Sequence, residues 1–577
     1  MVGTCGSPCP NSSPSKWSLA FFGAAALAFF SMPKSYQILR VAFALLLMFW
    51  LSSAAASTVL TFLHTRGQDI VDEKGNKVLL RGVGLGNWLL PEGYMWKFGD
   101  NGDRPRRIEK ITRDLLGEEN AKRFWTEYRK NYIAEADIKR IAKLGYNSVR
   151  PALNARLFLD ENGAPDDKAE GFILLDQLVA WCKANDIYVI IDMHAAPGGQ
   201  TGQNIDDSAN DQPELFMDAK YQDQLVALWK HIAHRYRKES AVAGYDLFNE
   251  PLPERTGAAA AYKAQVEPLY QRITAAIRQV DPKHMIIVEG VNWANDWSVF
   301  THPFDANLVY QFHYYCWDHP VELKSIRQYL DQRNRLDAPV WVGETGESDN
   351  AIYWATTEYF EANNIGWSFW PWKKMDTQNT PYSIKSPAQW NAVAAYSRGG
   401  EKPSPETAQK AFDELLANVR LQNCVYHPEV VNAMLRRAPV RIEAENYGQA
   451  GQGVSYFVND TNQLSRFYRK SEAVPVVPLE ATRRQSGQYI SLKASEWTAY
   501  TVWSSTAKNY RLTAKIQALD QPSQIQFAVG DRTFDATVST NVWQEIELGE
   551  IPLVQGDNRI RFTVKKGVAN LDWLEVK

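Results

Sequence analysis

The sequence predicts an α/β fold, a (β/α)₈ TIM barrel, followed by a C-terminal all-β jelly-roll sandwich. The chain has 577 residues, too many for a single core of ordinary size, so two or more domains are expected. From about residue 67 to residue 397, short apolar runs alternate with amphipathic helical stretches, which is typical of a parallel barrel. From residue 440 onward, short alternating segments separated by turn residues predict antiparallel strands.

The first element is an N-terminal signal or hydrophobic segment, residues 1–56. Basic Lys34 and Arg40 precede an apolar core at 41–51, and small residues follow at 54–56. This order is typical of a cleaved signal peptide, because the apolar core is shorter than the ~20 residues that a membrane-spanning helix needs. We therefore expect a secreted protein, extracellular or periplasmic. The alternative is a protein anchored in the membrane through this same segment.

The second element is the predicted barrel domain, residues 57–400. Eight strand-like runs occur there, separated by helical stretches such as 135–144 and 172–184. This count and alternation favour a closed barrel over a doubly wound sheet. No GxGxxG fingerprint follows an early strand, which argues against a nucleotide partner. The predicted strands are 78–85, 147–151, 188–194, 244–249, 285–289, 308–313, 340–344 and 366–370.

The third element is a linker with a helical tail, residues 401–438, and the fourth is the sandwich, residues 439–577. Glycines and prolines between 398 and 405 mark the linker. Alternating runs such as 488–492 and 510–518 predict the strands of the sandwich.

Charge and composition narrow the possible partners. The formal net charge is -3 and charged residues make up 22%, so nothing indicates nucleic-acid binding. The aromatic share is 12%, with 20 Trp, which suits a protein that also stacks rings on flat ligands such as sugars. We expect a polysaccharide or oligosaccharide substrate, no nucleic acid, no nucleotide and a monomeric protein.

Polar or ring-bearing side chains stand at the C-terminal ends of the predicted barrel strands. In a TIM barrel these ends meet at one face, where the reacting groups lie. For any single residue, a core role or a structural ion pair explains the position equally well, but so many together favour a functional site. These residues are Arg150, His194, Asn249, Glu250, His313, Tyr315, Glu344 and Trp370.

Two of these residues are glutamates, Glu250 and Glu344. Two carboxylates that face one cleft can cleave a glycosidic bond, since one protonates the leaving oxygen and the other attacks the anomeric carbon. The acid must keep its proton through burial or a neighbouring charge, and the nucleophile must stay ionised, which Arg150 would favour. No serine elbow and no HExxH occurs, so peptidase or zinc chemistry has no comparable support.

Six motifs carry a family resemblance: NSVRP, DMHAAP, LFNEP, FHYY, WVGETG and GWSFW, in this order. Over roughly residues 67–396 they resemble the catalytic domain of glycoside hydrolase family 5. The resemblance implies a retaining mechanism that needs no cofactor for catalysis. It implies that Glu250 is the acid/base and Glu344 the nucleophile.

The same resemblance implies roles for the other strand-end residues. Asn249 would hydrogen-bond the 2-hydroxyl of the sugar, and Arg150 and Tyr315 would position the nucleophile. His194 and His313 would line the central subsite. Trp370 would stack under the sugar, with Trp372 as a competing platform.

Two loops bear on the substrate. RGVGLGNWLLPEGYMW and HAAPGGQTGQN resemble the loops of fungal-type exo-β-1,3-glucanases, although Ala195 replaces a glycine of that branch and residues 201–203 depart from it. We expect hydrolysis of a β-glucan, with β-1,3 linkages preferred. The alternatives are a β-1,4-glucanase (cellulase) or mannanase of the same family, a transglycosylase using the same glutamates, or a catalytically inactive carbohydrate-binding protein.

The C-terminal region resembles carbohydrate-binding modules of families 6 and 35, through VRIEAENYG at 440–448 and ANLDWLEVK at the end. The resemblance implies a structural calcium held by Glu443, Glu445 and Asp572. Oxygen ligands of this kind suit calcium, and a salt-bridged pair of strands is the alternative.

Sugar binding by this module would fall to Tyr489 and Asn570, according to the same resemblance. The family places a stacking ring shortly before a strand tryptophan, which Trp543 matches here. Residues 540–542 contain no aromatic ring, so it stays open whether the module binds sugar.

Overall fold

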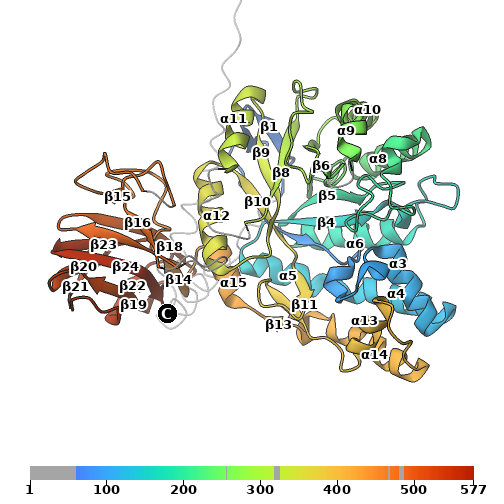
Figure 1. The fold of residues 1–577 in the computed structure, drawn as a ribbon. Coiled ribbons are helices and arrows are strands. Elements are labelled where there is room, and N and C mark those ends of the chain that lie inside the picture. The colour runs from blue at the N-terminus through green and yellow to red at the C-terminus, as the bar shows by residue number, and fades with distance from the viewer. Residues whose placement is uncertain (1–59, 255–256, 317–324, 466–467, 480–486) are drawn as a thin grey trace, which may run out of the picture. The chain divides into compact units, whose positions relative to one another are not determined.

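The computed structural model describes residues 60–254, 257–316, 325–465, 468–479 and 487–577 (Figure 1). The N-terminal segment 1–56, for which a signal peptide or an anchor is expected, lies outside the described residues. Among the described residues, no helix is long and apolar enough to cross a membrane.

Eight parallel strands close into a barrel in the order β10-β3-β4-β5-β6-β7-β8-β9, as the sequence predicts. Every residue of seven of these strands is buried, and in β3 only the first residue is partly exposed. The strands are β3 (Arg81–Leu85), β4 (Ser148–Asn154), β5 (Tyr188–Ala195), β6 (Val242–Asp246), β7 (Met285–Glu289), β8 (Leu308–Tyr314), β9 (Val340–Gly346) and β10 (Gly366–Trp370).

Six of the eight predicted strands differ in their bounds from the observed ones, and the end of β6 matters most for the site. The apolar run around Leu247 predicts a strand up to Asn249, but β6 ends at Asp246. The next residues still pair with neighbouring strands, since the Leu247 N–H donates to the Ile287 carbonyl at 3.1 Å. The backbone then turns sharply at Glu250, whose φ is +44°. Asn249 and Glu250 therefore lie in a turn just beyond the strand.

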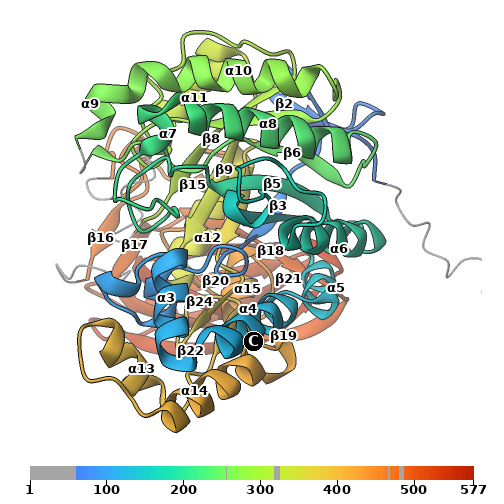
Figure 2. The ribbon, with the colours of Figure 1, turned by 90° about the vertical axis from the view of Figure 1, so that its right-hand side faces the viewer.

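Helices surround the barrel and connect its strands (Figures 1 and 2). The carboxylate of Asp349 caps α12 by accepting the Ile352 N–H at 3.0 Å. Ser404 caps α14, which begins at Pro405. The helices are α3 (Pro105–Leu116), α4 (Glu118–Tyr132), α5 (Glu135–Leu144), α6 (Glu170–Ala184), α7 (Glu214–Met217), α8 (Ala219–Tyr236), α9 (Ala258–Tyr262), α10 (Val266–Arg278), α11 (Arg327–Leu336), α12 (Asn350–Ala362), α13 (Trp390–Ser397), α14 (Pro405–Asn418) and α15 (Pro428–Met434).

Two small sheets accompany the barrel. One pairs β1 (His64–Arg66) with β2 (Asp69–Val71), and the other contains β11 (Lys373–Met375), β12 (Tyr382–Ile384) and β13 (Val425–Tyr426). The strand β11 follows directly after the last barrel strand, so the chain leaves the barrel through this small sheet.

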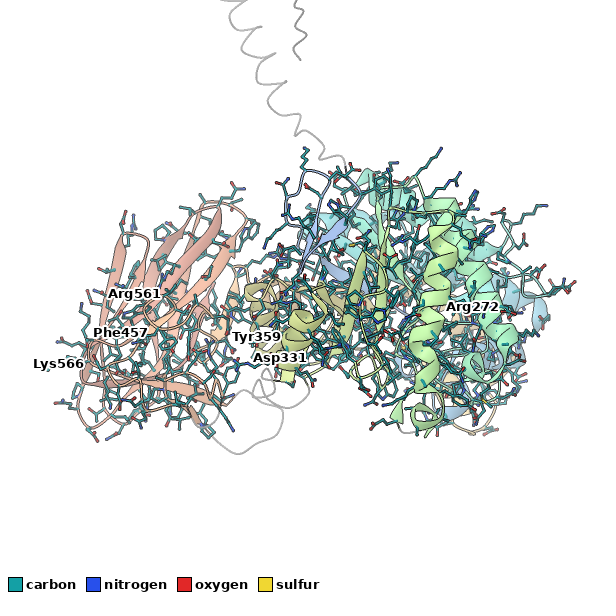
Figure 3. The ribbon with its side chains drawn as sticks, turned by 90° about the horizontal axis from the view of Figure 1, so that it is seen from above. Arg272, Asp331, Tyr359, Phe457, Arg561 and Lys566 are labelled. Carbon is teal, nitrogen blue, oxygen red and sulfur yellow. The ribbon has the colours of Figure 1, made fainter. Side chains whose placement is uncertain are left out.

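The C-terminal region forms two antiparallel sheets, as the sequence predicts. In β23 the residues alternate: Ile560 and Phe562 are buried, and Arg561, labelled in Figure 3, is exposed. One face of that sheet therefore packs in the core. One sheet contains β14 (Val440–Glu443), β16 (Val476–Pro478), β17 (Gln488–Lys493), β24 (Val568–Val576), β19 (Lys508–Ala518) and β22 (Gln544–Leu553); the other contains β15 (Tyr456–Phe457), β18 (Trp497–Ser504), β23 (Gly556–Lys566), β20 (Ser523–Val529) and β21 (Arg532–Val538).

Candidate active site

A cavity of about 680 Å³ opens at the C-terminal ends of the barrel strands. Six of the eight predicted site residues of the barrel line it, and the other two, Arg150 and Asn249, lie buried in contact with those residues. The structure therefore brings all eight together, from strands far apart in the sequence. The six lining residues are His194, Glu250, His313, Tyr315, Glu344 and Trp370.

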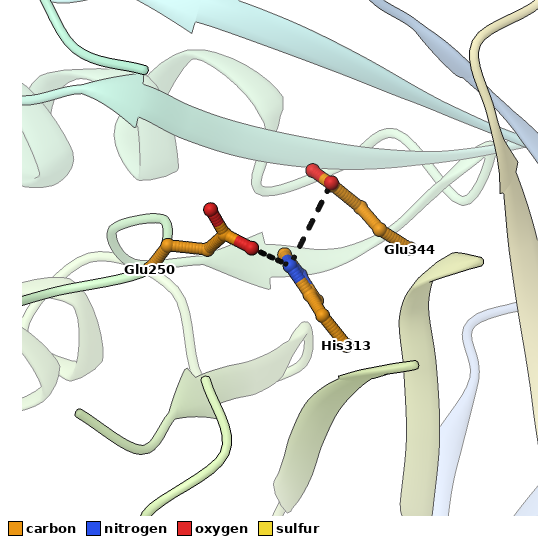
Figure 4. A group of neighbouring side chains, drawn as sticks. All are labelled: Glu250, His313 and Glu344. Carbon is orange, nitrogen blue, oxygen red and sulfur yellow. Dashed lines mark hydrogen bonds and ion pairs between the residues drawn. The ribbon is translucent and has the colours of Figure 1, made fainter. Parts of the chain in front are cut away.

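Glu250 and Glu344 face each other across the imidazole of His313 (Figure 4). The Nδ1 atom of His313 lies 2.6 Å from Oε1 of Glu250 and 3.6 Å from Oε2 of Glu344. One nitrogen of His313 and one carboxylate oxygen of each glutamate all lie within 4.8 Å of one another. The two carboxylates are thus close enough to act on one bond of a bound molecule.

Glu344 is held in its ionised form. Burial alone would raise the pKa of this carboxyl, but His313, Arg150, His194 and the Tyr315 hydroxyl together lower the pKa below its ordinary value. Arg150 Nη1 lies 2.7 Å from Oε1, and the Tyr315 hydroxyl donates to Oε2 at 2.7 Å. A carboxylate with this environment can serve as a nucleophile or an anchor for positive charge.

Glu250 has the opposite tendency. Burial raises the pKa of its carboxyl, and the neighbouring charges of Glu344 and Glu289 raise it further, against the lowering effect of His313. Burial opposes the protonation of His313, but Glu344, Glu289 and Glu250 raise the pKa of the imidazole well above its ordinary value. The contact between Glu250 and His313 therefore holds a proton that can be given to a bound molecule.

Arg150 lies at the centre of the barrel floor. Its guanidinium group contacts carboxylates from four strands, at 3.2 Å from Asp192, 2.8 Å from Asp246, 3.0 Å from Glu289 and 2.7 Å from Glu344. Burial raises the pKa of Asp246 well above its ordinary range, and this outweighs the lowering effect of Arg150. The raised pKa favours the neutral form of Asp246, and that form reduces the negative charge that the single guanidinium must balance.

The walls of the cavity are fixed by contacts among Asn249, His194 and Trp370. Asn249 accepts a hydrogen bond from Arg150 Nη2 at 2.9 Å, and its Nδ2 lies 3.2 Å from Nε2 of His194. The imidazole of His194 stacks on Trp370, with centroids 5.1 Å apart and planes 3° apart. Trp372, the competing platform, is buried away from the cavity, because its indole N–H donates to Asp137 at 2.9 Å.

The neighbours of His194 raise the pKa of its imidazole. Burial lowers the pKa of the imidazole, but the neighbouring Asp192, 2.8 Å away, and Glu344 raise it to about 9. This imidazole, stacked on Trp370, gives the cavity wall a polar edge and an aromatic face.

Eleven residues that line the cavity were not predicted from the sequence, among them Glu92, Tyr94 and Glu347. Burial raises the pKa of Glu92 to about 8, and its Oε1 atom has no hydrogen-bond partner in the protein. This carboxyl is therefore available as a partner for a hydroxyl group of a ligand. The sequence could have indicated Glu92, because the segment LLPEGYMW places this carboxylate after the first barrel strand, at the face where active sites form.

A group of polar side chains beneath the cavity was also not predicted. They belong to buried runs of the barrel strands: YVIIDMHA carries a carboxylate within the run, and VAGYD and MIIVE each end on one. A charged residue within such a run is the signal that could have found them, because buried charges are rare without partners. The group comprises Asp192, Asp246, Glu289 and Gln311.

The predicted sugar-binding residues of the sandwich lie on neighbouring strands. Ser491 of β17 pairs with Asn570 of β24, so Tyr489, two residues before Ser491, shares a face with Asn570. Tyr489 packs edge-on against Trp543, with centroids 5.4 Å apart. Asn570 is buried and donates to Gln517 at 3.2 Å. Sugar binding at these residues stays a prediction.

The three predicted calcium ligands are all buried, but two of them already have partners. Asp572 lies 2.8 Å from Lys515, and one oxygen of Glu443 lies 3.0 Å from Arg441. Both carboxylate oxygens of Glu445 and the other oxygen of Glu443 have no hydrogen-bond partner in the protein. The part of the chain that the structure describes does not gather these three carboxylates within 4.8 Å of one another.

Comparisons with known proteins show which proteins the barrel resembles. Residues 114–376 match the family described as Cellulase (glycosyl hydrolase family 5). A β-xylosidase of Phanerodontia chrysosporium is 28% identical over 367 residues, which cover 56% of this chain and 74% of the relative. A probable glucan 1,3-β-glucosidase A of Neosartorya fischeri is 27% identical over 279 residues, covering 46% of this chain and 64% of the relative. Endoglucanase C of Acetivibrio thermocellus is 27% identical over 195 residues, which cover 33% of this chain and 53% of the relative.

The barrel and its family match define a glycoside hydrolase. More narrowly, residues 114–376 form a glycoside hydrolase family 5 domain, and its relatives are β-glycosidases. Enzymes of this family need no cofactor for catalysis. The expected family and enzyme class are thus confirmed for the barrel, whereas the type of the C-terminal module stays a prediction. The chain covers slightly less than two thirds of the fungal glucosidase, at 64% of its length.

Proposed function

We propose that the protein is a retaining β-glucanase in which Glu344 is the nucleophile and Glu250 the acid/base. The observation that carries this proposal is the close approach of the two carboxylates, since one oxygen of each lies within 4.8 Å of the other. Retaining glycosidases have carboxyl groups about 5–5.5 Å apart, while inverting enzymes leave ~6.5–9.5 Å for a water molecule. The short separation therefore supports direct attack by one carboxylate.

In the first step, Glu344 attacks the anomeric carbon and forms a covalent glycosyl ester. Glu250 donates its proton to the leaving glycosidic oxygen as that bond breaks. In the second step, Glu250 removes a proton from water, the water oxygen attacks the same carbon, and the ester bond to Glu344 breaks. Each glutamate returns to its starting protonation state, and the anomeric configuration is retained.

The surrounding residues support both steps. Arg150 and Tyr315 hold Glu344 by two contacts of 2.7 Å and keep it ionised before attack. Asn249 is held by Arg150 and lies against His194, which places its amide beside the nucleophile for a sugar hydroxyl. Trp370 offers an aromatic ring at the cavity wall for a sugar face.

The substrate that we favour is a β-glucan with β-1,3 linkages. Support comes from the loop resemblance and from relatives named as glucan 1,3-β-glucosidases. A β-1,4-glucan is the second candidate because another relative is named an endoglucanase, and xylan is a third because of the named β-xylosidase. Mannan stays open on the breadth of the family alone.

Two further proposals concern the ends of the chain. We infer that residues 1–56 direct secretion, supported by the order of basic, apolar and small residues. We also infer a structural calcium in the sandwich, supported by the buried, unpartnered oxygens of Glu445 and Glu443. Asp572 fits this ion less well because Lys515 already pairs with it.

The test of the catalytic proposal is product analysis on laminarin, lichenan, cellulose, mannan and xylan, with NMR detection of the first anomer released. A retaining enzyme releases the β-anomer first. Glu344→Gln is expected to reduce kcat by at least about 10⁴-fold, as removal of a nucleophile does in other enzymes. Release of the α-anomer, or near wild-type turnover by this variant, would contradict the mechanism.

A further inference from the structure

We propose that Glu289, at the end of β7, is a positioning residue that fixes both glutamates of the site at once. It lies beneath the cavity and is fully buried. One carboxylate oxygen contacts the backbone of Glu250, and the other contacts the arginine that holds Glu344. The inference rests on the proposed roles of those two glutamates.

The first contact acts on the backbone of Glu250. Its N–H donates to Oε2 of Glu289 at 2.7 Å. Glu250 has a φ of +44°, a left-handed conformation that is unfavourable for a residue with a side chain. Such a conformation persists only where surrounding contacts hold it, and a carboxylate acceptor makes a strong hydrogen bond. The direction in which Glu250 presents its carboxyl therefore depends on Glu289.

The second contact acts on Glu344 through Arg150. Oε1 of Glu289 accepts a hydrogen bond from Arg150 Nη2 at 3.0 Å and another from the side-chain amide of Gln311. The other terminal nitrogen of Arg150, Nη1, holds Glu344 at 2.7 Å. A planar guanidinium that is fixed on one side is also fixed on the other.

Glu289 is itself held firmly. The hydroxyl of Tyr270, on α10, donates to the Glu289 carbonyl at 2.9 Å and accepts the Glu289 N–H at 3.2 Å. Tyr270 in turn stacks on Phe248, with centroids 4.1 Å apart and planes 9° apart. Phe248 lies two residues before Glu250, so one ring pair ties the end of β7 to the turn that carries the acid/base.

The negative charge of Glu289 also acts on the proton that His313 and Glu250 share. Its Oε1 lies 3.5 Å from Nε2 of His313, the imidazole that contacts Glu250. Loss of this charge would make protonated His313 and protonated Glu250 less stable. The titratable and charged groups around Glu289 come from five barrel strands, the turn after β6 and α10. They are Arg150, Asp192, Asp246, Glu250, Tyr270, His313 and Glu344.

Glu289→Gln is the decisive variant because it keeps the size of the side chain. Its single oxygen is expected to face Arg150 and Gln311, since the charged donor makes the stronger bond. The amide nitrogen then faces the Glu250 N–H, and two donors repel. This substitution should therefore disturb Glu250 more than Glu344, and Glu289→Ala should disturb both.

The readout is the dependence of the loss on the leaving group. The assay uses a 2,4-dinitrophenyl β-glycoside, which needs little acid help, and an unactivated oligosaccharide that the wild type cleaves. General acid catalysis contributes roughly 10²–10⁴-fold, so displacement of the acid should cost Glu289→Gln about 10–100-fold in kcat on the oligosaccharide. On the activated glycoside the loss should stay below about threefold, with KM nearly unchanged. The alkaline limb of the pH profile should move to lower pH.

Asp281→Asn serves as the matched control. Asp281 is also fully buried, precedes β7 at its opposite end, and accepts the Tyr245 hydroxyl at 2.7 Å. This variant should lower the melting temperature without any dependence on the leaving group. Equal losses of Glu289→Gln on both substrates, or no loss, would overturn the positioning role. Failure of the proposed function is a different result, in which the wild type cleaves neither glycoside or Glu344→Gln remains active.

Discussion

Glu250 and Glu344 share one cavity yet hold their protons differently because of what each one touches. Glu344 accepts hydrogen bonds from a guanidinium and a phenol, which stabilise its charge. Glu250 is buried beside other carboxylates, which stabilise its neutral form. Two carboxyl groups of the same kind thus receive opposite tendencies from their immediate neighbours, as acid/base pairs require.

Removal of the Tyr315 hydroxyl tests this difference. Tyr315→Phe deletes the donor to Oε2 of Glu344, which lies 2.7 Å away. A hydrogen bond to a charged group contributes about 1.5–3 kcal/mol, so kcat/KM should fall roughly 10–100-fold. The pKa of Glu344 should rise, and the acidic limb of the pH profile of kcat/KM should move to higher pH. An acidic limb at the wild-type position would show that this hydroxyl does not stabilise the charge.

At the scale of the element, β3 shows how a strand shapes the cavity wall. Two glycines, Gly84 in the sequence RGVGL and Gly86 just after it, lie where Trp370 of β10 approaches. A Cβ atom at Gly84 or Gly86 would lie 2.4 Å from the indole ring. The two glycines therefore allow the ring of Trp370 to lie flat against His194, with planes 3° apart.

Gly86→Ala is expected to displace the Trp370 ring. The new methyl group would overlap the indole, and such overpacking costs about 1–3 kcal/mol. If the ring carries a sugar, KM for oligosaccharides should rise about tenfold or more, while kcat changes less. Steady-state kinetics together with a melting curve measure both effects. An unchanged KM in a folded variant would remove Trp370 from the substrate site.

The strands of the barrel were predictable because their interiors are continuous apolar runs, and β7 and β10 have the predicted bounds. The end of β6 was not, because Leu247 and Phe248 continue the apolar pattern after the strand has ended. The strand-end residues were predictable from the rule that such ends meet. Glu92 was not, since it follows the strand in an irregular loop without periodicity. Glu289 was taken only as a strand end, because its partners come from other strands.

At the scale of the whole molecule, Glu361 joins segments far apart in the sequence. Its carboxylate on α12 binds Arg81 at the start of β3, at 2.7 Å and 2.9 Å, and also Arg436 after α15. Next along the chain, Ala438 donates its N–H to the Trp503 carbonyl of the sandwich at 2.9 Å. The barrel, the helical tail and the first contact with the sandwich therefore meet near one partly buried carboxylate.

Glu361→Gln should destabilise the protein in a pH-dependent way. Burial alone would raise the pKa of Glu361, but Arg81 and Arg436 lower it from 4.5 to about 2. A lowered pKa means that the stabilisation is present above pH 4.5 and is lost as the pH falls towards 2. At pH 7 the variant should lose about 3 kcal/mol in urea unfolding, and the difference from the wild type should shrink below pH 4.5. A difference that does not depend on pH would contradict this ion pair.

Calcium should stabilise the sandwich if the buried oxygens of Glu445 and Glu443 bind it. A ligand that binds only the folded state at 100 times its Kd adds about 2.7 kcal/mol, which corresponds to a rise of roughly 5–10 °C in the melting transition. The measurement is calorimetry of the full chain in EDTA and after addition of calcium chloride.

Two variants decide whether these carboxylates are the ligands. Glu445→Gln should abolish the calcium-dependent rise, because an amide presents only one neutral oxygen. Glu496→Gln is the matched control, since Glu496 is buried in the same sandwich but accepts hydrogen bonds from the N–H groups of Asn459 at 2.9 Å and Lys493 at 2.8 Å. This control should keep the full rise. A rise that persists in Glu445→Gln, or no rise in the wild type, would leave the salt-bridged pairs of Glu443 with Arg441 and Asp572 with Lys515 as the explanation of these buried charges.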